Sequence, residues 1–270
     1  MAVLIVAASS GGGNVCLAGG RGGRLSDAPK EGRSVRNLVD ETPFDPLSGR
    51  PLFTTRLVGA DAVRGREILD VGCGFGWFVH HCLEGGAARV AAIESADEQI
   101  AVVRRHLPDC RLNVVSGSAL TLPFPDASFD VVVSWEVLEH LPKGSEGQFF
   151  AEVARVLRPG GSLTLSTPHW SLAANLLDPA WLLTGHRHYR PGDVEAFGAG
   201  VGLVPDWSLV RGGWWELLGM INLYVAKWIF RRRPFMADYF RRKTDAEYAR
   251  NGGFATLFAR FVKAPDSCAA

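Results

Sequence analysis

The stretch Ile68–Phe78, ILDVGCGFGWF, decides how this sequence folds. An apolar run contains Asp70 near its end, and glycine then occupies every second position, at Gly72, Gly74 and Gly76. Strands buried on both faces read as short apolar runs, and glycines after a strand let the backbone approach a ligand closely. The stretch therefore predicts a buried strand followed by a ligand-binding loop.

Strand-like and helix-like segments alternate along the chain from about residue 60. Strands are predicted at 66–71, 89–94, 111–117, 129–135 and 161–167, and helices at 76–86, 96–107 and 146–157. This alternation favours parallel strands joined by right-handed crossovers, and hence a doubly wound α/β sheet. Ligands of such sheets lie beyond the carboxyl ends of the strands, which is where the three glycines fall.

The residues of the loop exclude two common ligands, nucleoside triphosphates and dinucleotides. A triphosphate-binding loop needs Lys followed by Ser or Thr, and neither is present. A dinucleotide-binding loop has glycine at the position that Trp77 occupies here. The spacing instead suits a cofactor with an amino acid end and a nucleoside end but no phosphate.

Composition narrows the class of protein. The 270 residues, 47% of them hydrophobic, can bury a substantial core as one domain with an appendage. A net charge of +1 gives no global reason to expect a nucleic-acid partner. The five cysteines include no C-x-x-C pair, which favours reduced thiols in a cytoplasmic protein over disulfides or a zinc site. Glycine-rich residues 1–38 are predicted to be a disordered tail rather than a signal peptide.

Three motifs, in the right order and spacing, resemble class I S-adenosylmethionine-dependent methyltransferases: ILDVGCGFG, LPFPDASFDVVVSWEVLEHL and EVARVLRPGG. The resemblance covers about residues 52–206, and the nearest branch includes the ubiquinone-pathway O-methyltransferases. It implies a mostly parallel seven-stranded sheet with an antiparallel last strand, and S-adenosyl-L-methionine as the cofactor. It also implies methyl transfer to a small-molecule acceptor, with oxygen favoured over carbon or nitrogen as the acceptor atom.

The resemblance assigns cofactor-binding roles to the residues after the first two strands. Gly72, Gly74 and Gly76 pass under the methionine end of the cofactor, where a Cβ would collide. Asp70 anchors this loop and faces the cationic end of the ligand. Glu94 ends the second strand and resembles the acid that accepts hydrogen bonds from both ribose hydroxyls.

The adenine side departs from the family pattern. Relatives commonly have Asp where this chain has Ser118, whose neutral hydroxyl is a weaker acceptor for the adenine amino group. The amide of Ala119 serves the ring nitrogen, and Trp135 lines the methionine side. We therefore expect the cofactor to bind, with its tightness depending on how well Ser118 replaces the acid.

The letters EVLEH suggest further chemistry. Glu136, Glu139 and His140 are predicted at the start of a helix, with Glu136 and His140 on one face. Some relatives use this constellation to hold a divalent metal, but acids are also favoured near helix N-termini by the macrodipole. No metal ligand is assigned. His140 and His169 are the candidates for a general base if the acceptor must lose a proton.

Residues 209–253 are predicted to be a helical insertion between a core at 39–208 and a closing antiparallel strand and tail at 254–270. Positions 227–243 carry seven basic residues and one acid, Asp238, a local charge of +6. The insertion could be a packing element, a homodimer contact, a lid over a hydrophobic or anionic acceptor, or an anchor on anionic lipid. We expect a cytoplasmic methyltransferase, peripheral at the membrane if the anchor holds, and keep a catalytically silent scaffold subunit as the alternative.

Overall fold

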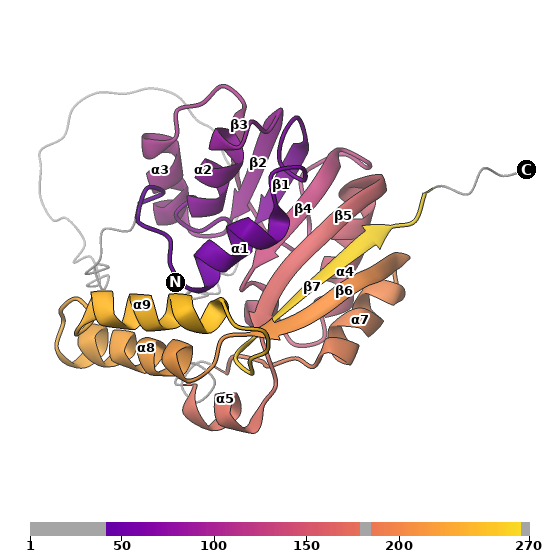
Figure 1. Ribbon diagram of the computed structural model, residues 1–270. Helices are drawn as coiled ribbons and strands as arrows, with labels where there is room; N and C mark the ends of the chain where they lie inside the picture. Colours follow the sequence, from indigo (N-terminus) through magenta and orange to yellow (C-terminus); the bar gives the residue numbers. More distant parts are fainter. Residues whose placement is uncertain (1–41, 179–184, 266–270) are drawn as a thin grey trace, which may run out of the picture.

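The computed structural model describes residues 42–178 and 185–265, which form one α/β unit (Figure 1). The tail predicted to be disordered lies outside these residues. So do the last residues of the predicted closing segment.

A seven-stranded sheet forms the centre of the molecule, with strand order β3-β2-β1-β4-β5-β7-β6. Strands β1 to β5 are parallel, and β7 pairs antiparallel with both β5 and β6. The predicted seven-stranded sheet with an antiparallel last strand is therefore confirmed. The strands are β1 Glu67–Val71, β2 Arg89–Glu94, β3 Leu112–Ser116, β4 Phe129–Trp135, β5 Leu157–Pro168, β6 Leu203–Arg211 and β7 Thr256–Lys263.

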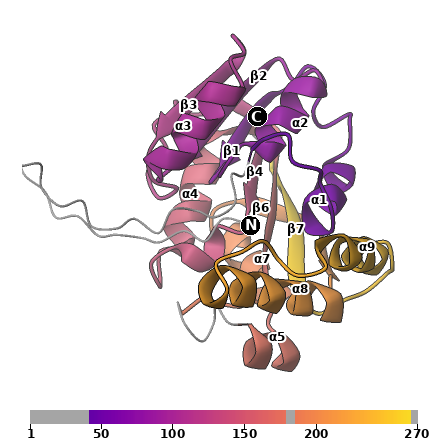
Figure 2. The ribbon, with the colours of Figure 1, turned by 90° about the vertical axis from the view of Figure 1, so that its left-hand side faces the viewer.

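Helices cover both faces of the sheet, as Figures 1 and 2 show. One face carries α2 (Trp77–Glu84) and α3 (Asp97–His106), with α1 (Arg50–Val58) beside α2. The other carries α4 (Glu146–Val156) and α7 (Pro191–Ala199). The central strands supply apolar side chains to both cores, which is why they read as continuous apolar runs.

The remaining helices lie across the carboxyl ends of the parallel strands. These are α5 (Leu172–Leu177), α8 (Trp214–Tyr224) and α9 (Ala237–Tyr248), and α8 and α9 pack side by side (Figure 1). A π-helical turn, Val225–Ile229, extends α8. The sixth strand runs to Arg211, a little into the predicted insertion, and α8 and α9 fill the rest of it. In the described part of the chain, no helix is both long and apolar enough to cross a bilayer.

The EVLEH segment is not the start of a long helix, so that prediction was wrong. Glu136 has a positive φ of 55°, and only Leu138–His140 form a short 3-10 turn. The left-handed residue turns the chain sharply after β4, and Pro142 follows before α4 begins. The helical spacing that would place Glu136 and His140 on one face is therefore absent.

Candidate functional site

The glycine loop connects β1 to α2, and all three of its glycines have positive φ, between 54° and 87°. A Cβ at Gly72 would strike Val137, and one at Gly76 would lie 2.9 Å from Val103 Cγ2. A Cβ at Gly74 would point into open space. Two of the glycines are thus required by the protein's own packing, and only Gly74 leaves room for a ligand.

Glu94 is buried at the end of β2 and holds the loop in place. Its Oε2 accepts a hydrogen bond from Gly74 N at 3.0 Å, and its Oε1 accepts from Ser95 N at 2.7 Å and Ala96 N at 3.2 Å. Oε1 also accepts from Ser95 Oγ at 3.2 Å and is fully used, whereas Oε2 holds one bond and can accept one more. Glu94 therefore organises the loop and still lines the cavity beside it.

Asp70 lies behind the loop and is fully buried. Neither of its carboxylate oxygens accepts a hydrogen bond from any described residue, so the predicted anchoring of the loop by Asp70 is not seen. Burial, together with the nearby Glu94, raises the pKa of Asp70 to about 8. Asp70 is not among the residues that line the cavity, and it would be stabilised by a positive charge brought close to it.

A cavity of about 1120 Å³ opens from the glycine loop toward α8. Pockets for one small ligand occupy roughly 300–1,000 Å³, so this cavity is somewhat larger than one such pocket. Ser118, Ala119 and Trp135, which were predicted to contact the cofactor, line it together with Trp77. Ser118 Oγ accepts from Leu120 N at 3.1 Å, while Trp135 Nε1 is buried without a partner among the described residues.

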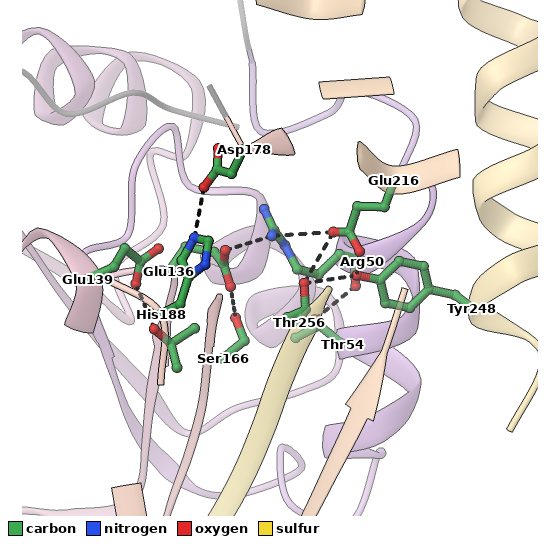
Figure 3. Close-up of polar contacts among 11 residues, drawn as sticks. Arg50, Thr54, Glu136, Glu139, Ser166, Asp178, His188, Glu216, Tyr248 and Thr256 are labelled. Carbon is green, nitrogen blue, oxygen red and sulfur yellow. Dashed lines mark hydrogen bonds and ion pairs between the residues drawn. The ribbon is translucent and has the colours of Figure 1, made fainter. Parts of the chain in front are cut away.

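At the end of the cavity next to α8, charged and polar side chains from five separate segments form one hydrogen-bonded group (Figure 3). Arg50 Nη1, on α1, donates to Glu136 Oε2 at 2.6 Å and to Glu216 Oε1, on α8, at 3.5 Å. Glu136 also accepts from Ser166 Oγ of β5 at 2.7 Å. Tyr248 of α9 donates its hydroxyl to Glu216 Oε2 at 2.7 Å. We call these five side chains the Arg50 network.

Acids outnumber bases in this end of the cavity. Arg50 is the only lysine or arginine among the described lining residues. Burial opposes its charge, but Glu136 and Glu216 outweigh that effect and raise the pKa of Arg50. Burial raises the pKa of Glu216 to about 7, and burial with Glu136 nearby raises the pKa of Glu139 well above its usual value. Glu139 accepts a hydrogen bond from Thr167 Oγ1 at 3.1 Å.

The two predicted base candidates are placed differently. His140 lines the cavity, and its ring meets that of His186 edge to face, with 4.3 Å between centroids. Burial, with the neighbouring His186 and Arg187, lowers the pKa of His140 to about 4, so it is neutral at pH 7. His169 is not a lining residue, and its Nδ1 lies 3.2 Å from the carbonyl oxygen of Phe254.

Two further features bear on the sequence-based predictions. Among the residues the structure describes, no three His, Cys, Asp or Glu side chains are grouped so that they could hold a metal ion.

Arg50, Glu216 and Tyr248 were missed by sequence reasoning. They lie far apart in the chain and in no motif, so only the fold brings them together.

Known proteins match the middle of the chain. Residues 69–165 match the family described as "Methyltransferase domain". A probable S-adenosylmethionine-dependent methyltransferase of Mycolicibacterium smegmatis is 41% identical over 39% of this chain and 39% of its own. The ubiquinone biosynthesis O-methyltransferase of Paracidovorax citrulli is 35% identical over 51% and 58%, respectively. The chain thus spans well under two thirds of the length of these relatives.

The fold is also that of solved methyltransferases. A crystal structure of geranyl diphosphate C-methyltransferase from Streptomyces coelicolor, with Mg²⁺, geranyl diphosphate and S-adenosyl-L-homocysteine bound, superimposes with a TM-score of 0.58. It is 15% identical, covers 79% of this chain and 77% of that chain, and so supports the fold alone. The strand order and this superposition show the class I methyltransferase fold, and the match to the methyltransferase domain covers residues 69–165 of the chain.

Proposed function

We propose that this protein transfers a methyl group from S-adenosylmethionine to a hydroxyl oxygen of a neutral, largely apolar small molecule. The observation that carries the proposal is one continuous cavity, which runs from Gly74 and Glu94 to the Arg50 network. Its volume is somewhat larger than that of a pocket for one small ligand. Holding reactants in line can supply roughly 7–11 kcal/mol of a reaction barrier.

The cofactor end fits S-adenosylmethionine in three respects. Gly74 leaves open space where a side chain would stand. Glu94 Oε2 keeps acceptor capacity for one ribose hydroxyl. Ser118, Ala119 and Trp135 would enclose the adenine and methionine sides. The cofactor supplies a methyl group already activated as a sulfonium, so the protein has mainly to position the acceptor.

The acceptor end favours a neutral molecule over an anionic one. Among the described residues that line it, the only arginine is already paired with two acids, and Glu139 adds a third carboxyl group. A phosphate or carboxylate placed there would meet these acids without a free cation. On α8, Leu217, Met220 and Leu223 add an apolar wall. The anionic acceptor expected from the basic insertion therefore finds no support inside the cavity.

His140 is the residue we assign to take the proton from the acceptor hydroxyl. It lines the cavity and is neutral at pH 7, so it can accept a proton, and its pKa of about 4 makes it a weak base that suits an acidic hydroxyl such as that of a phenol. Oxygen as acceptor is further supported by the Paracidovorax citrulli relative, whose name specifies O-methylation. Glu136 would orient the hydroxyl through the acceptor capacity left by Arg50 and Ser166.

The first experiment measures cofactor binding by calorimetry with S-adenosylhomocysteine, comparing the wild type with two variants. Gly74→Ala and Gly160→Ala both place a Cβ at positive φ in open space, and so they carry similar backbone strain. Gly160 lies outside the cavity lining. We expect Gly74→Ala to weaken binding by roughly thirtyfold and Gly160→Ala to leave it within about twofold. Tighter binding of NAD than of the nucleoside would overturn the cofactor assignment.

The second experiment measures transfer of labelled methyl from S-adenosylmethionine to a panel of neutral alcohols and phenols, amines and carboxylates. Turnover is expected with a neutral hydroxyl acceptor and not with its phosphorylated counterpart. Preferred turnover of an amine or a phosphorylated acceptor would contradict the proposal. Cofactor binding without turnover of any acceptor would favour the scaffold alternative, and activity lost on chelation would favour the metal-assisted one.

A further inference from the structure

Large apolar side chains are exposed on the outer face of the helices below the sheet. On α8, Trp214 and Leu218 are four residues apart, so they lie on one side of the helix, and both are exposed. On α5, Leu172 and Leu176 have the same spacing and are also exposed. Both views place α5 lower than α8, and in Figure 1 it lies under the end of α8 nearest the sheet. Together these four side chains form what we call the apolar face.

The apolar face continues to the turn between α8 and α9. There Ile229, Phe230 and Met236 expose 70%, 56% and 67% of their surfaces, respectively. The segment 229–236, which we call the hairpin tip, thus presents three large apolar side chains to solvent. Soluble proteins rarely expose such clusters without a binding partner.

Basic side chains surround the apolar ones at the hairpin tip. Arg231, Arg232 and Arg233 are all exposed, and Arg232 lies over the ring of Phe235 at 4.5 Å. Arg242 and Lys243 on α9 are exposed as well. Nearby, Asp238 is the only acid between residues 227 and 243, and it already pairs with Arg241. The tip therefore combines unpaired positive charge with exposed apolar surface.

We propose that the apolar face and the hairpin tip dock on the surface of an anionic lipid membrane. Apolar side chains that enter the acyl boundary, flanked by arginines that meet anionic headgroups, are the chemistry of interfacial helices. A second copy of the chain fits less well, because a twofold contact centred on the tip would bring like charges together. This surface lies outside the methyl-transfer site and goes beyond the proposed function.

The inner side of α8 lines the cavity, while its outer side belongs to the proposed membrane surface. Leu217, Met220 and Leu223 line the cavity, whereas Trp214 and Leu218 on the same helix face outward. One helix therefore separates the cavity from the proposed membrane surface. An apolar acceptor dissolved in the membrane would have a short way to the cavity.

The test is sedimentation of the full chain with vesicles of phosphatidylcholine, with or without about one third phosphatidylglycerol. We expect binding to the anionic vesicles at low salt and release at about 1 M salt, where the Debye length falls to about 3 Å. Each basic residue near such a surface contributes roughly a fivefold factor, so replacing Arg231, Arg232 and Arg233 by Ser should weaken binding by roughly a hundredfold. Replacing Ile229 and Phe230 by Ser should weaken it at all salt concentrations.

Matched controls separate local from general effects. Arg64 precedes β1, Arg89 begins β2 and Arg105 lies in the last turn of α3; all three are exposed and lie outside α5, α8 and the hairpin tip, and their triple Ser variant should bind like the wild type. Val204→Ser is the control for loss of an exposed apolar side chain. Calorimetry with S-adenosylhomocysteine checks that every variant is folded, independently of the proposed acceptor.

Several results would overturn the proposal. Wild-type protein that stays in the supernatant with anionic vesicles at low salt would do so. Equal binding to neutral and anionic vesicles, or equal losses in the two triple variants, would remove the role of the tip. A stable dimer in sedimentation equilibrium that Ile229→Ser with Phe230→Ser dissociates would assign the face to a second copy instead.

Discussion

The two ends of the cavity are built in different ways. The cofactor end uses residues at the ends of consecutive parallel strands, such as Gly74 after β1 and Glu94 at the end of β2. The acceptor end uses side chains from α1, the turn after β4, β5, α8 and α9. The first end depends on backbone conformation within short motifs, and the second on contacts between segments remote in sequence. A cofactor site can therefore be recognised from short sequence motifs, while an acceptor site depends on the completed fold.

Removing the arginine of the Arg50 network tests whether the acceptor end depends on long-range contacts. Arg50→Met should lower the free energy of unfolding by about 3 kcal/mol, because it leaves Glu136 and Glu216 without their cation. The value is at the low end for buried pairs, since the Arg50 side chain is 16% exposed. Arg241→Met, which breaks an exposed pair with Asp238, should cost under about 1 kcal/mol. Chemical denaturation measures both, and equal losses would refute the distinction.

The histidines at the acceptor end provide a kinetic test. With an accepting hydroxyl compound, His140→Gln should lower kcat by roughly a hundredfold or more, the usual contribution of a general base. Because the neutral form is active, kcat/KM of the wild type should rise as the pH increases through about 4. His169→Gln, outside the cavity lining, should leave kcat within about twofold. A larger effect at His169 would reverse the assignment.

At the cofactor end, Glu94→Ala should weaken S-adenosylhomocysteine binding by at least about tenfold, since charge-assisted hydrogen bonds contribute roughly 1.5–3 kcal/mol. Some stability should also be lost, because Gly74, Ser95 and Ala96 lose their acceptor. Glu98→Ala removes an exposed acid that also lines the cavity, and it is the matched control. Calorimetry that gives Glu94→Ala an affinity within twofold of wild type would disprove the ribose contact.

Asp70 provides a test in the protein without cofactor. Its folded pKa of about 8 lies above the ordinary 3.8, so the fold favours the protonated form. The stability that this proton contributes is complete below about 4 and is lost as the pH rises through 8. The Asp70→Asn variant should therefore gain in melting temperature relative to wild type as the pH rises from about 4 to 8. The melting temperature of the Asp61→Asn variant should vary with pH in the same way as that of the wild type. If the melting temperature of Asp70→Asn also does so, the raised pKa of Asp70 is contradicted.

The sheet and the glycine loop could be predicted because their signals are local. Apolar runs of strand length fix β1 to β5, and the loop that follows ILDV needs positive φ at three glycines. The reason for the glycines was only partly foreseen. Gly72 and Gly76 avoid Val137 and Val103, side chains that no local pattern places beside them.

The turn after β4 shows where pattern reasoning failed. Most residues of EVLEH are compatible with a helix. Glu136 nevertheless adopts a left-handed conformation in which its carboxylate reaches both Arg50 and Ser166. A left-handed conformation at a non-glycine residue costs roughly 1–2 kcal/mol, which tertiary bonds can offset. Helical propensity was overridden by contacts made only in the folded protein. The same long-range contacts explain why Glu216 and Tyr248 were missed.

The position of the α8–α9 pair within the sheet has a consequence for how this protein can change. The pair connects β6 to β7, which are neighbouring antiparallel strands, so it is an enlarged hairpin connection. Closing a flexible loop costs only about 0.6 kcal/mol more for each doubling of its length. Strand pairing at Arg211 and Thr256 therefore tolerates connections of very different size. The segment between them is an exchangeable module: its replacement could retarget the enzyme to another acceptor while leaving the cofactor end intact.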